Sequence, residues 1–464
     1  MNFSFLNRII HVNQEMPALI GRQSRLSYLE LDEKVRNTIS VLERNGITKQ
    51  SRVILPGTHD IDFVLLLLAL WRIGAIPIPL NIRLKENERK DIISLASPVF
   101  TIPDTHTFDE IKYWDKGAAE QKNVEWDSGI ILFTSGTTGI PKGVVLSITN
   151  LLSSADAVNN ILLPSPEDKW LASLPFYHIG GIMILVRAFA AGLTVILPDS
   201  FEVSSTAYYL KEFRPAFMSF VPTVLKRLLE NNVYPNSEVK FMLLGGGPVK
   251  DELAIEAVSK GWEILKVYGS SETCSMFTAL HINDEINKLS SAGRPLNGNS
   301  IKIVSETKQE LPNGEIGEIA VTGPTIFKEY LNNEAETQLR IKNSFYLTGD
   351  IGHLDHDGYL YIHSRRTDLI ISGGENISPV EIENALLNIP EVQQACVIGI
   401  TDEEWGQIPA AVVISEGYID SESIIKALRN SLASYKIPKK IIFIDKFPLT
   451  PLGKINKEKL KALF

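Results

Sequence analysis

Short apolar runs alternate with longer stretches of helical periodicity through much of the 464-residue chain. The runs "SRVILPG", "GLTVILP" and "VKFMLLGGG" are brief and bounded by Gly or Pro, which is typical of buried strands. The segments "SFEVSSTAYYLKEF" and "PVKDELAIEAVSKG" predict helices, and the second begins with a proline and acidic residues. This alternation predicts βαβ units and sheets covered by helices.

The pattern changes from about Gly293, where "NSIKIVSETKQELPNGEIGEIAVTG" has closely spaced strand and turn signals and predicts a β-rich subdomain. After "YIHSRRTDLIISGGENISP" the sequence predicts a helix ("PVEIENALLNI"), two strands ("QQACVIGI", "AAVVIS") and another helix ("SESIIKALRNSLA"). We therefore expect an α/β fold in two parts. Residues 1–364 form a large domain of helix-covered sheets plus the β-rich subdomain, and residues 365–464 form a small, mobile α/β domain.

Composition and charge narrow the class of protein. Hydrophobic residues make up 44% of the chain and charged residues 22%, so a large core can form. The net charge of −9 argues against a general nucleic-acid binder. The 2 cysteines, Cys274 and Cys396, lie far apart, which favours a reducing compartment over a disulfide framework or a zinc site.

The N-terminal sequence has no basic segment followed by a long apolar run, so no secretory signal is expected. The most apolar stretch, Phe63 to Trp71, is interrupted by Arg72 and Gly74. It is shorter than the roughly 20 residues that a membrane span needs, which predicts a buried helix. We expect a cytoplasmic protein without a membrane span, and the sequence leaves its oligomeric state open, a dimer included.

The segment "SGIILFTSGTTGIPKGVV" predicts a strand, a glycine-rich loop, a lysine and a second strand. Glycines let backbone N–H groups converge on an anion, and nearby hydroxyls and Lys142 add donors and charge, which together favour phosphate binding. The loop G-x-x-x-x-G-K-[ST] does not match, because Pro141 precedes the lysine and Gly143 follows it. A plain flexible surface loop is the alternative.

The motif "TSGTTGIPKG" resembles the phosphate-loop signature of the adenylate-forming enzymes, which include acyl-CoA synthetases, adenylation domains and firefly-type luciferases. The resemblance implies the fold of that family and a set of residues that bind ATP. In this segment the set is Thr134, Ser135, Gly136, Thr137, Thr138, Gly139 and Lys142.

"VYGSSETCS" is similar to the family segment Y-G-x-T-E-T. The resemblance implies that Tyr268 stacks on adenine and that Glu272 binds the Mg²⁺ that bridges the phosphates, a role that suits a hard oxygen ligand. Ser271 stands where the family usually has threonine and retains the hydroxyl. An ordinary loop acid is the alternative for Glu272. Further nucleotide-binding candidates, from this segment and from "LLGGGP", are Gly269, Gly246 and Gly247.

"YLTGDIGHLDHDGYLYIHSRRTDLIISGGENISP" resembles two more family signatures. They imply that Asp350 binds the ribose hydroxyls and that Arg365 makes a second contact to the nucleotide; a surface salt bridge is the alternative. The resemblance further implies a hinge at Thr367 and Asp368, and room for the pantetheine of CoA at Gly373 and Gly374.

"LTPLGKINK" resembles the family's P-x-x-G-K signature, with Lys454 as its lysine. In that role Lys454 stabilises the negative charge that develops as the acyl carboxylate attacks the α-phosphate. A solvated surface charge is the alternative. The predicted catalytic residues are Lys454, Glu272, His178 and Lys142.

The resemblance also indicates candidate residues of the acyl pocket. His178 in "LPFYHIGGIMILVRAF" matches a family segment near the acyl and CoA channel, and a satisfied core histidine is the alternative. Arg187 is a candidate to bind a second carboxylate. The candidates for the pocket wall are His178, Gly180, Ser219, Gly245, Ser270 and Thr273.

The resemblance implies an ATP-dependent acid–CoA ligase that uses Mg²⁺, forms an acyl-adenylate and then a thioester, and needs no covalent nucleophile. Its partners are a small carboxylic acid, ATP and CoA. The chain resembles the 2-succinylbenzoate–CoA ligases of menaquinone biosynthesis in its short length and in the segments "LPFYHIGG", "LLGGGP", "YGSSETCS", "SAGRPL" and "RRTDLIISGGENI". Three alternatives stay open: a fatty-acid or aryl-acid CoA ligase, an adenylation enzyme that loads a carrier protein, and a non-catalytic nucleotide-binding module.

Overall fold

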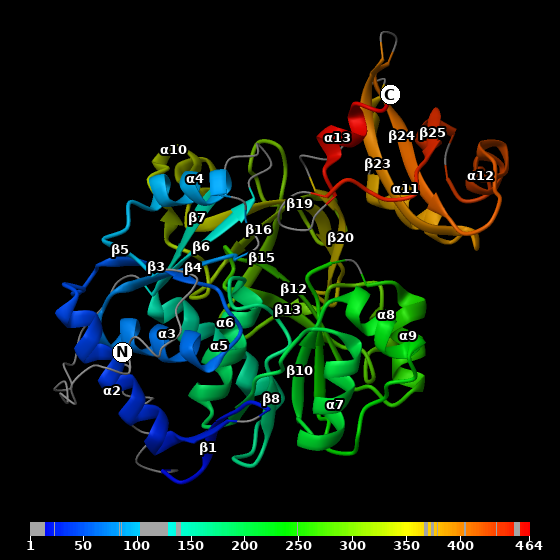
Figure 1. Cartoon of the computed structure of the whole chain (residues 1–464). Coiled ribbons are helices and arrows are strands. Elements are labelled where there is room, and N and C mark those ends of the chain that lie inside the picture. The colour runs from blue at the N-terminus through cyan, green and yellow to red at the C-terminus, as the bar shows by residue number, and fades with distance from the viewer. Residues whose placement is uncertain are drawn as a thin grey trace. The chain divides into compact units, whose positions relative to one another are not determined.

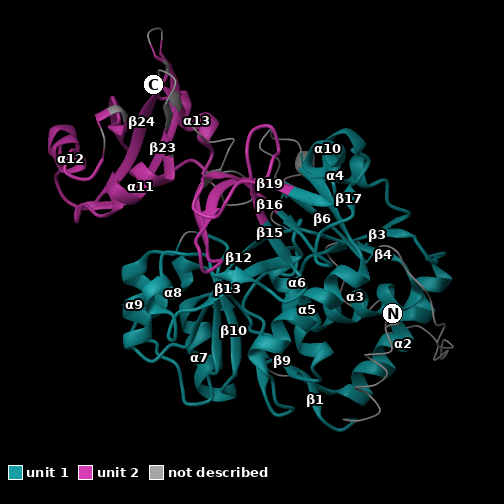
Figure 2. Cartoon of the chain, turned by 180° about the vertical axis from the view of Figure 1, so that it is seen from behind, with its two compact units in different colours: residues 1–301, 321–346 teal, residues 302–320, 347–464 magenta. Residues whose placement is uncertain are grey.

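The computed structural model describes most of the chain and divides it into two compact units (Figure 2). Unit 1 comprises Met1–Ile301 and Val321–Tyr346, and unit 2 comprises Lys302–Ala320 and Leu347–Phe464. The described residues are 14–22, 24–82, 84, 86–102, 129–135, 141–247, 249–365, 370–372, 375–377, 379–402, 405–432, 434–449 and 455–464. The predicted boundary between residues 364 and 365 stays a prediction.

The largest sheet of unit 1 is parallel at its centre (Figure 1). Its strand order is β14-β13-β12-β11-β10-β8-β9-β1-β2. The central strands are β8 (Lys169–Leu171), β9 (Thr194–Ile196), β10 (Phe217–Phe220), β11 (Phe241–Leu244) and β12 (Ile264–Ser270). The outer strands are β1 (Pro17–Ile20), β2 (Arg25–Ser27), β13 (Ser275–His281) and β14 (Arg294–Pro295). Since carboxyl ends of parallel strands meet at one edge, the residues after β10 and β11 lie together there, while β12 continues past Lys266, which is level with Leu244 of β11.

Helices connect the parallel strands, as the alternating sequence pattern predicts. They are α6 (Ile179–Ala190), α7 (Val203–Phe213), α8 (Pro222–Glu230) and α9 (Asp251–Ser259), and α5 (Ile148–Leu162) precedes β8. The strands expected in "SRVILPG", "GLTVILP" and "VKFMLLGGG" are confirmed as β3 (Arg52–Pro56), β9 and β11. Helix α9 begins later than its sequence predicts, because Lys250 is in an extended conformation as the N-cap residue.

Two smaller sheets complete unit 1. One has the order β4-β3-β5, with β4 (Ile76–Leu80) and β5 (Phe100–Thr101), and is accompanied by α2 (Tyr28–Arg44), α3 (Ile61–Ile73) and α4 (Glu86–Ala96). The other has the order β17-β7-β6, with β6 (Ile130–Ser135), β7 (Pro141–Leu146) and β17 (Glu329–Tyr330). Helix α10 (Glu334–Arg340) follows β17.

The β-rich region after Gly293 is confirmed. Its sheet has the order β15-β16-β19-β18, with β20 paired to β19. The strands are β15 (Ser300–Val304), β16 (Gly317–Thr322), β18 (Ile341–Lys342), β19 (Phe345–Leu354) and β20 (Leu360–Arg365). A 3-10 turn, Ile286–Lys288, precedes this region.

The C-terminal part of unit 2 is a small α/β layer, as predicted. Its sheet has the order β22-β21-β24-β23 with β25 on β24. The strands are β21 (Ile370–Ser372), β22 (Glu375–Ile377), β23 (Val392–Asp402), β24 (Gly406–Ser415) and β25 (Lys440–Phe443), and the helices are α11 (Pro379–Leu387), α12 (Ser421–Leu428) and α13 (Lys457–Lys461). Its core includes the fully buried side chains Ile377, Ile382, Leu386, Val397 and Val413. A 3-10 turn covers Ser434–Lys436.

Helix α3, which contains the apolar stretch Phe63 to Trp71, is buried along almost its whole length, which confirms the expectation for that stretch. A helix that is apolar all round belongs in a core. Within the described parts of the chain, we find no helix with the length and hydropathy that spanning a bilayer requires.

A buried charge cluster joins α2 to α3. Asp32 Oδ1 on α2 lies 2.6 Å from Arg72 Nη2 on α3, and Asp32 Oδ2 lies 2.7 Å from Arg36 Nη2 on its own helix. The Asp32 and Arg72 side chains are only 5% and 11% exposed. Breaking such a pair is costly, because a buried charge stays behind without its partner.

We expect Asp32→Ala to lower the free energy of unfolding of unit 1 by about 3 kcal/mol, since Arg72 is then buried without a counter-ion. Urea titration followed by tryptophan fluorescence measures this, and Trp71, Trp170 and Trp262 report from buried positions in unit 1. Glu33→Ala is the matched control, because Glu33 is the exposed neighbour on the same helix. Equal effects of the two substitutions would contradict the role of the cluster.

Candidate nucleotide and acyl site

The predicted phosphate loop connects β6 to β7, which pair antiparallel. Residues Gly136, Thr137, Thr138 and Gly139 lie outside the described residues, and so does the side chain of Ser135. Lys142 lies inside β7 and is paired with Thr134 across the hairpin. The sequence predicted a lysine before the second strand; the strand instead begins at Pro141, so Lys142 is held by a regular ladder.

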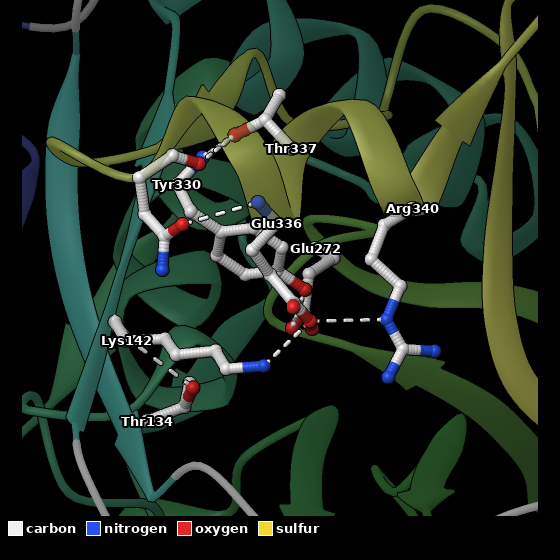
Figure 3. A network of polar contacts seen from close by, with 8 residues as sticks. Thr134, Lys142, Glu272, Tyr330, Glu336, Thr337 and Arg340 are labelled. Atoms are coloured by element: carbon white, nitrogen blue, oxygen red, sulfur yellow. Dashed lines mark hydrogen bonds and ion pairs between the residues drawn. The ribbon is translucent and has the colours of Figure 1, made fainter.

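The ammonium of Lys142 contacts a carboxylate that the sequence did not single out. Its Nζ lies 2.6 Å from Glu336 Oε1 on α10, and Arg340 Nε donates to the same oxygen at 3.1 Å (Figure 3). Burial opposes ionisation of Glu336, but hydrogen bonds from Lys142 and Arg340 outweigh it and hold the pKa of this carboxyl below its ordinary value. Lys142 therefore has an anionic partner within unit 1.

Tyr330 on β17 lies between Lys142 and the predicted metal ligand. Lys142 Nζ lies 5.4 Å from the centroid of the Tyr330 ring, within range of a cation–π contact. The Tyr330 hydroxyl donates to Glu272 Oε1 at 2.9 Å (Figure 3). Burial raises the pKa of Tyr330 above its ordinary value, and the charge of Glu272 raises it further, so the hydroxyl keeps its proton and acts as the donor.

Backbone hydrogen bonds fix Glu272 and the hairpin to the same segment. Phe327 N donates to Glu272 O at 2.8 Å, and Leu331 N donates to Gly143 O at 2.7 Å. Five residues of chain thus connect the predicted metal ligand to the predicted phosphate loop. A single carboxylate with one oxygen already oriented fits Mg²⁺, which is usually held by one or two carboxylates together with substrate phosphates. Among the residues that the structure describes, no group of three or more His, Cys, Asp and Glu side chains could hold a metal ion.

The turn that carries Glu272 is tightly constrained. The ladder between β12 and β13 shifts register between Tyr268 and Gly269, and a Cβ at Gly269 would lie 1.7 Å from Ser275 O. Only glycine fits this approach. Cys274 and Ser275 have φ values of 55° and 82°, a left-handed conformation that non-glycine residues rarely adopt. Strain of this kind persists where the surroundings impose it, often at functional sites.

Three predicted pocket residues lie in or directly after the neighbouring parallel strands β10, β11 and β12. Ser219 is on β10, Gly245 follows β11, and Ser270 ends β12. The hydroxyls of Ser219 and Ser270 are buried and have no hydrogen-bond partner among the described residues. The Thr273 hydroxyl is instead used within the turn, where it accepts from Ser270 N at 2.8 Å and donates to Ser275 O at 3.0 Å. The register places Ser219 level with Leu265 of β12, well before Ser270, so the structure does not bring these two hydroxyls together.

The glycines after β11 have different roles. A Cβ at Gly245 would lie 2.6 Å from Val267 Cγ2 on β12, so close packing requires glycine there. Gly246 and Gly247 are exposed. His178 is the N-cap residue of α6 and is exposed, so it is not a core histidine, and Gly180 lies in the first turn of the same helix.

Arg187 on α6 is a buried cation. The residue is 1% exposed, and its Nε and Nη2 atoms have no hydrogen-bond partner among the described residues. Burial lowers the pKa of its guanidinium to about 10, an effect partly offset by Cys274. The group therefore stays charged near neutral pH. Since an uncompensated buried charge is costly, this arrangement favours an anionic ligand.

Other predicted residues belong to unit 2. Asp350 on β19 is 8% exposed and is paired in register with Arg365 on β20, whose side chain is outside the described residues. Thr367, Asp368, Gly373, Gly374 and Lys454 also lie outside them. The roles of all these residues stay predictions.

The sequence motifs do not indicate Tyr330, Glu336 or Arg340. The spacing of Glu336 and Arg340 predicts an ion pair on one helix face. Nothing in that spacing indicates Lys142, which lies 194 positions away along the chain.

Comparison with known proteins identifies the family. The AMP-binding enzyme family matches residues 6–331, and the AMP-binding enzyme C-terminal domain family matches residues 381–454. The chain is 34% identical to a 2-succinylbenzoate–CoA ligase from Enterococcus faecalis, over 98% of this chain and 97% of that protein.

Solved structures agree over nearly the whole chain. The o-succinylbenzoate CoA synthetase from Bacillus subtilis, in complex with the acyl-adenylate intermediate OSB-AMP, has a TM-score of 0.91 and 32% identity, covering 99% of this chain and 98% of that one. The same synthetase in complex with ATP and a magnesium ion has a TM-score of 0.91 and 31% identity, with 99% of each chain covered. The fold expected from the motifs is thereby confirmed, and the chain belongs to the AMP-binding enzyme family.

Proposed function

We propose that this protein is an ATP-dependent 2-succinylbenzoate–CoA ligase that acts in menaquinone biosynthesis. The observation that carries the choice of acid is the buried guanidinium of Arg187, whose Nε and Nη2 have no hydrogen-bond partner among the described residues. Succinylbenzoate has two carboxylates, so one can react while the other neutralises this cation. The names of the relatives, from Enterococcus faecalis and Bacillus subtilis, support the same acid.

In the first step a carboxylate oxygen of the acid attacks the α-phosphorus of ATP. A bond forms between them, the bond from the α-phosphorus to the bridging oxygen of the β-phosphate breaks, and pyrophosphate leaves. Lys142 binds phosphate, Glu272 holds Mg²⁺ with Tyr330 orienting its carboxylate, and Lys454 stabilises the developing charge. Bound Mg²⁺ supplies neutralising charge at the phosphates. Positioning and electrostatics account for catalysis without a covalent enzyme intermediate.

In the second step the sulfur of CoA attacks the acyl carbon, the bond to AMP breaks, and the thioester is released. We propose that the C-terminal domain turns about Thr367 and Asp368 between the steps, exchanging Lys454 for the segment at Gly373 and Gly374. A cytoplasmic location is part of the same proposal and fits the free, buried cysteines Cys274 and Cys396.

A fatty-acid or aryl-acid CoA ligase shares the motifs, but its acid substrate has no second carboxylate that could pair with Arg187. A carrier-loading enzyme shares the first step and differs in its thiol acceptor. A non-catalytic nucleotide-binding module would not need a lysine, a metal-binding carboxylate and an unpaired buried cation together.

We expect pyrophosphate release with 2-succinylbenzoate to exceed release with benzoate or octanoate, and AMP and thioester to form only when CoA is added. A coupled pyrophosphate assay across these three acids, with and without CoA, measures this. Equal or better activity on octanoate would refute the choice of acid and leave the enzyme class intact. Loss of CoA dependence would favour a carrier-loading enzyme.

Arg187→Met should lower kcat/KM for 2-succinylbenzoate about 10- to 100-fold, the range expected when a hydrogen bond to a charged group is lost. Methionine fills a similar volume without a charge, so the melting temperature should be unchanged or higher. Benzoate is the internal control, since it has no second carboxylate. An equal loss of activity on both acids would mean that Arg187 stabilises the fold and does not bind the second carboxylate.

Tyr330→Phe should raise the Mg²⁺ concentration at half-maximal activity about tenfold, the lower end of the usual effect of removing a hydrogen bond to a metal ligand. The phenyl ring that Lys142 contacts is retained, so the KM for ATP at saturating Mg²⁺ should change little. Titration of Mg²⁺ at fixed ATP measures the shift. An unchanged Mg²⁺ requirement would exclude a role for the hydroxyl in orienting Glu272.

A further inference from the structure

The lysine assigned to phosphate binding is already paired with an anion. Lys142 and Glu336 form a close ion pair whose two side chains are each 18% exposed. Partial burial limits screening by water and salt, so this contact is stronger than an exposed surface pair. Phosphate oxygens and the Glu336 carboxylate are therefore alternative partners for one ammonium group.

Glu336 also has a second cation within reach. Arg340 lies one turn further along α10 and donates to the same carboxylate oxygen, Oε1. The Glu336 amide is held by Asn333 Oδ1 at 3.1 Å, which fixes the start of the helix. If Lys142 moves to another anion, Glu336 keeps Arg340 as its partner and is not left as an isolated charge. The structure thus allows an exchange in which no buried charge loses every partner (Figure 3).

We propose that Glu336 is the resting counter-ion of Lys142, released to Arg340 when the phosphates of ATP bind and taken up again when pyrophosphate leaves. This inference rests on the proposed function, because it takes Lys142 as a phosphate ligand. Glu336 is then a positioning residue, which acts through Lys142. Since a polyanion beside Glu336 is repelled unless the pair opens, Glu336 lowers the affinity of the empty site for ATP and for pyrophosphate.

The same exchange has a consequence for turnover. A lysine with no competing anion would hold the pyrophosphate product more tightly. A carboxylate that reclaims the lysine favours release of the product. The Lys142–Glu336 ion pair therefore lowers the affinity for ATP and speeds the release of pyrophosphate.

Calorimetric titration of the full-length protein with magnesium pyrophosphate and with ATP tests the inference. Glu336→Gln keeps the shape of the side chain and removes its charge, and it should bind both ligands roughly threefold to tenfold more tightly than the wild type, as expected for loss of a competing ion pair. Damage to the fold would weaken binding, so a gain distinguishes the proposed role from a structural one.

Two further variants distinguish the direct contact between Lys142 and Glu336 from a general effect of negative charge on α10. Glu334→Gln removes a charge from the same helix at an exposed position away from Lys142 and should leave both affinities unchanged. Glu336→Asp preserves the net charge but shortens the side chain, and it should also bind pyrophosphate more tightly than the wild type. Unchanged or weaker binding by Glu336→Gln overturns the proposal, and so does an equal gain in Glu334→Gln. If the wild type binds neither ATP nor pyrophosphate, the proposed function itself fails.

Discussion

The site depends on the pairing of β17 with β7. Two residues of β17, Glu329 and Tyr330, oppose Val145 and Val144, and this short ladder attaches the chain near residue 330 to the hairpin of the phosphate loop. From there the Phe327 amide reaches the backbone of Glu272, while the Tyr330 hydroxyl reaches its carboxylate. Without this ladder, the hairpin that carries Lys142 would lose its connection to the turn that carries Glu272, the predicted metal ligand.

The sequence predicted the parts of this site that are written in local motifs. Lys142 and Glu272 were candidates because short signatures surround them, and their roles stay predictions. The elements β9, β11 and α3 were predicted because apolar runs have a clear length and boundary. Tyr330 and Glu336 were not, since their importance lies in contacts with residues 58 and 194 positions away. Local spacing carries no information on such contacts until the sheet order is known.

Arg187 could be predicted as a candidate but not as a buried, unpaired cation. Helix α6 carries it in an apolar sequence, which predicts burial of the helix and says nothing about a partner for the guanidinium. The structure adds that Nε and Nη2 lack partners among the described residues. The difference decides the interpretation, because a satisfied arginine is structural and an unsatisfied one favours an anionic ligand.

Arg187 and Lys142, the two cations assigned to the proposed site, differ in how their charge is compensated. Arg187 is deeply buried, and its Nε and Nη2 have no partner among the described residues, which suits selection of a ligand that brings its own charge. Lys142 retains some exposure and shares Glu336 with Arg340. The proposed site must bind the phosphates of ATP and then release pyrophosphate. If every cation there lacked a counter-ion, the uncompensated charge would bind pyrophosphate as tightly as ATP. Selectivity for the acid therefore fits a preorganised cation, and turnover of the phosphates fits an exchangeable one.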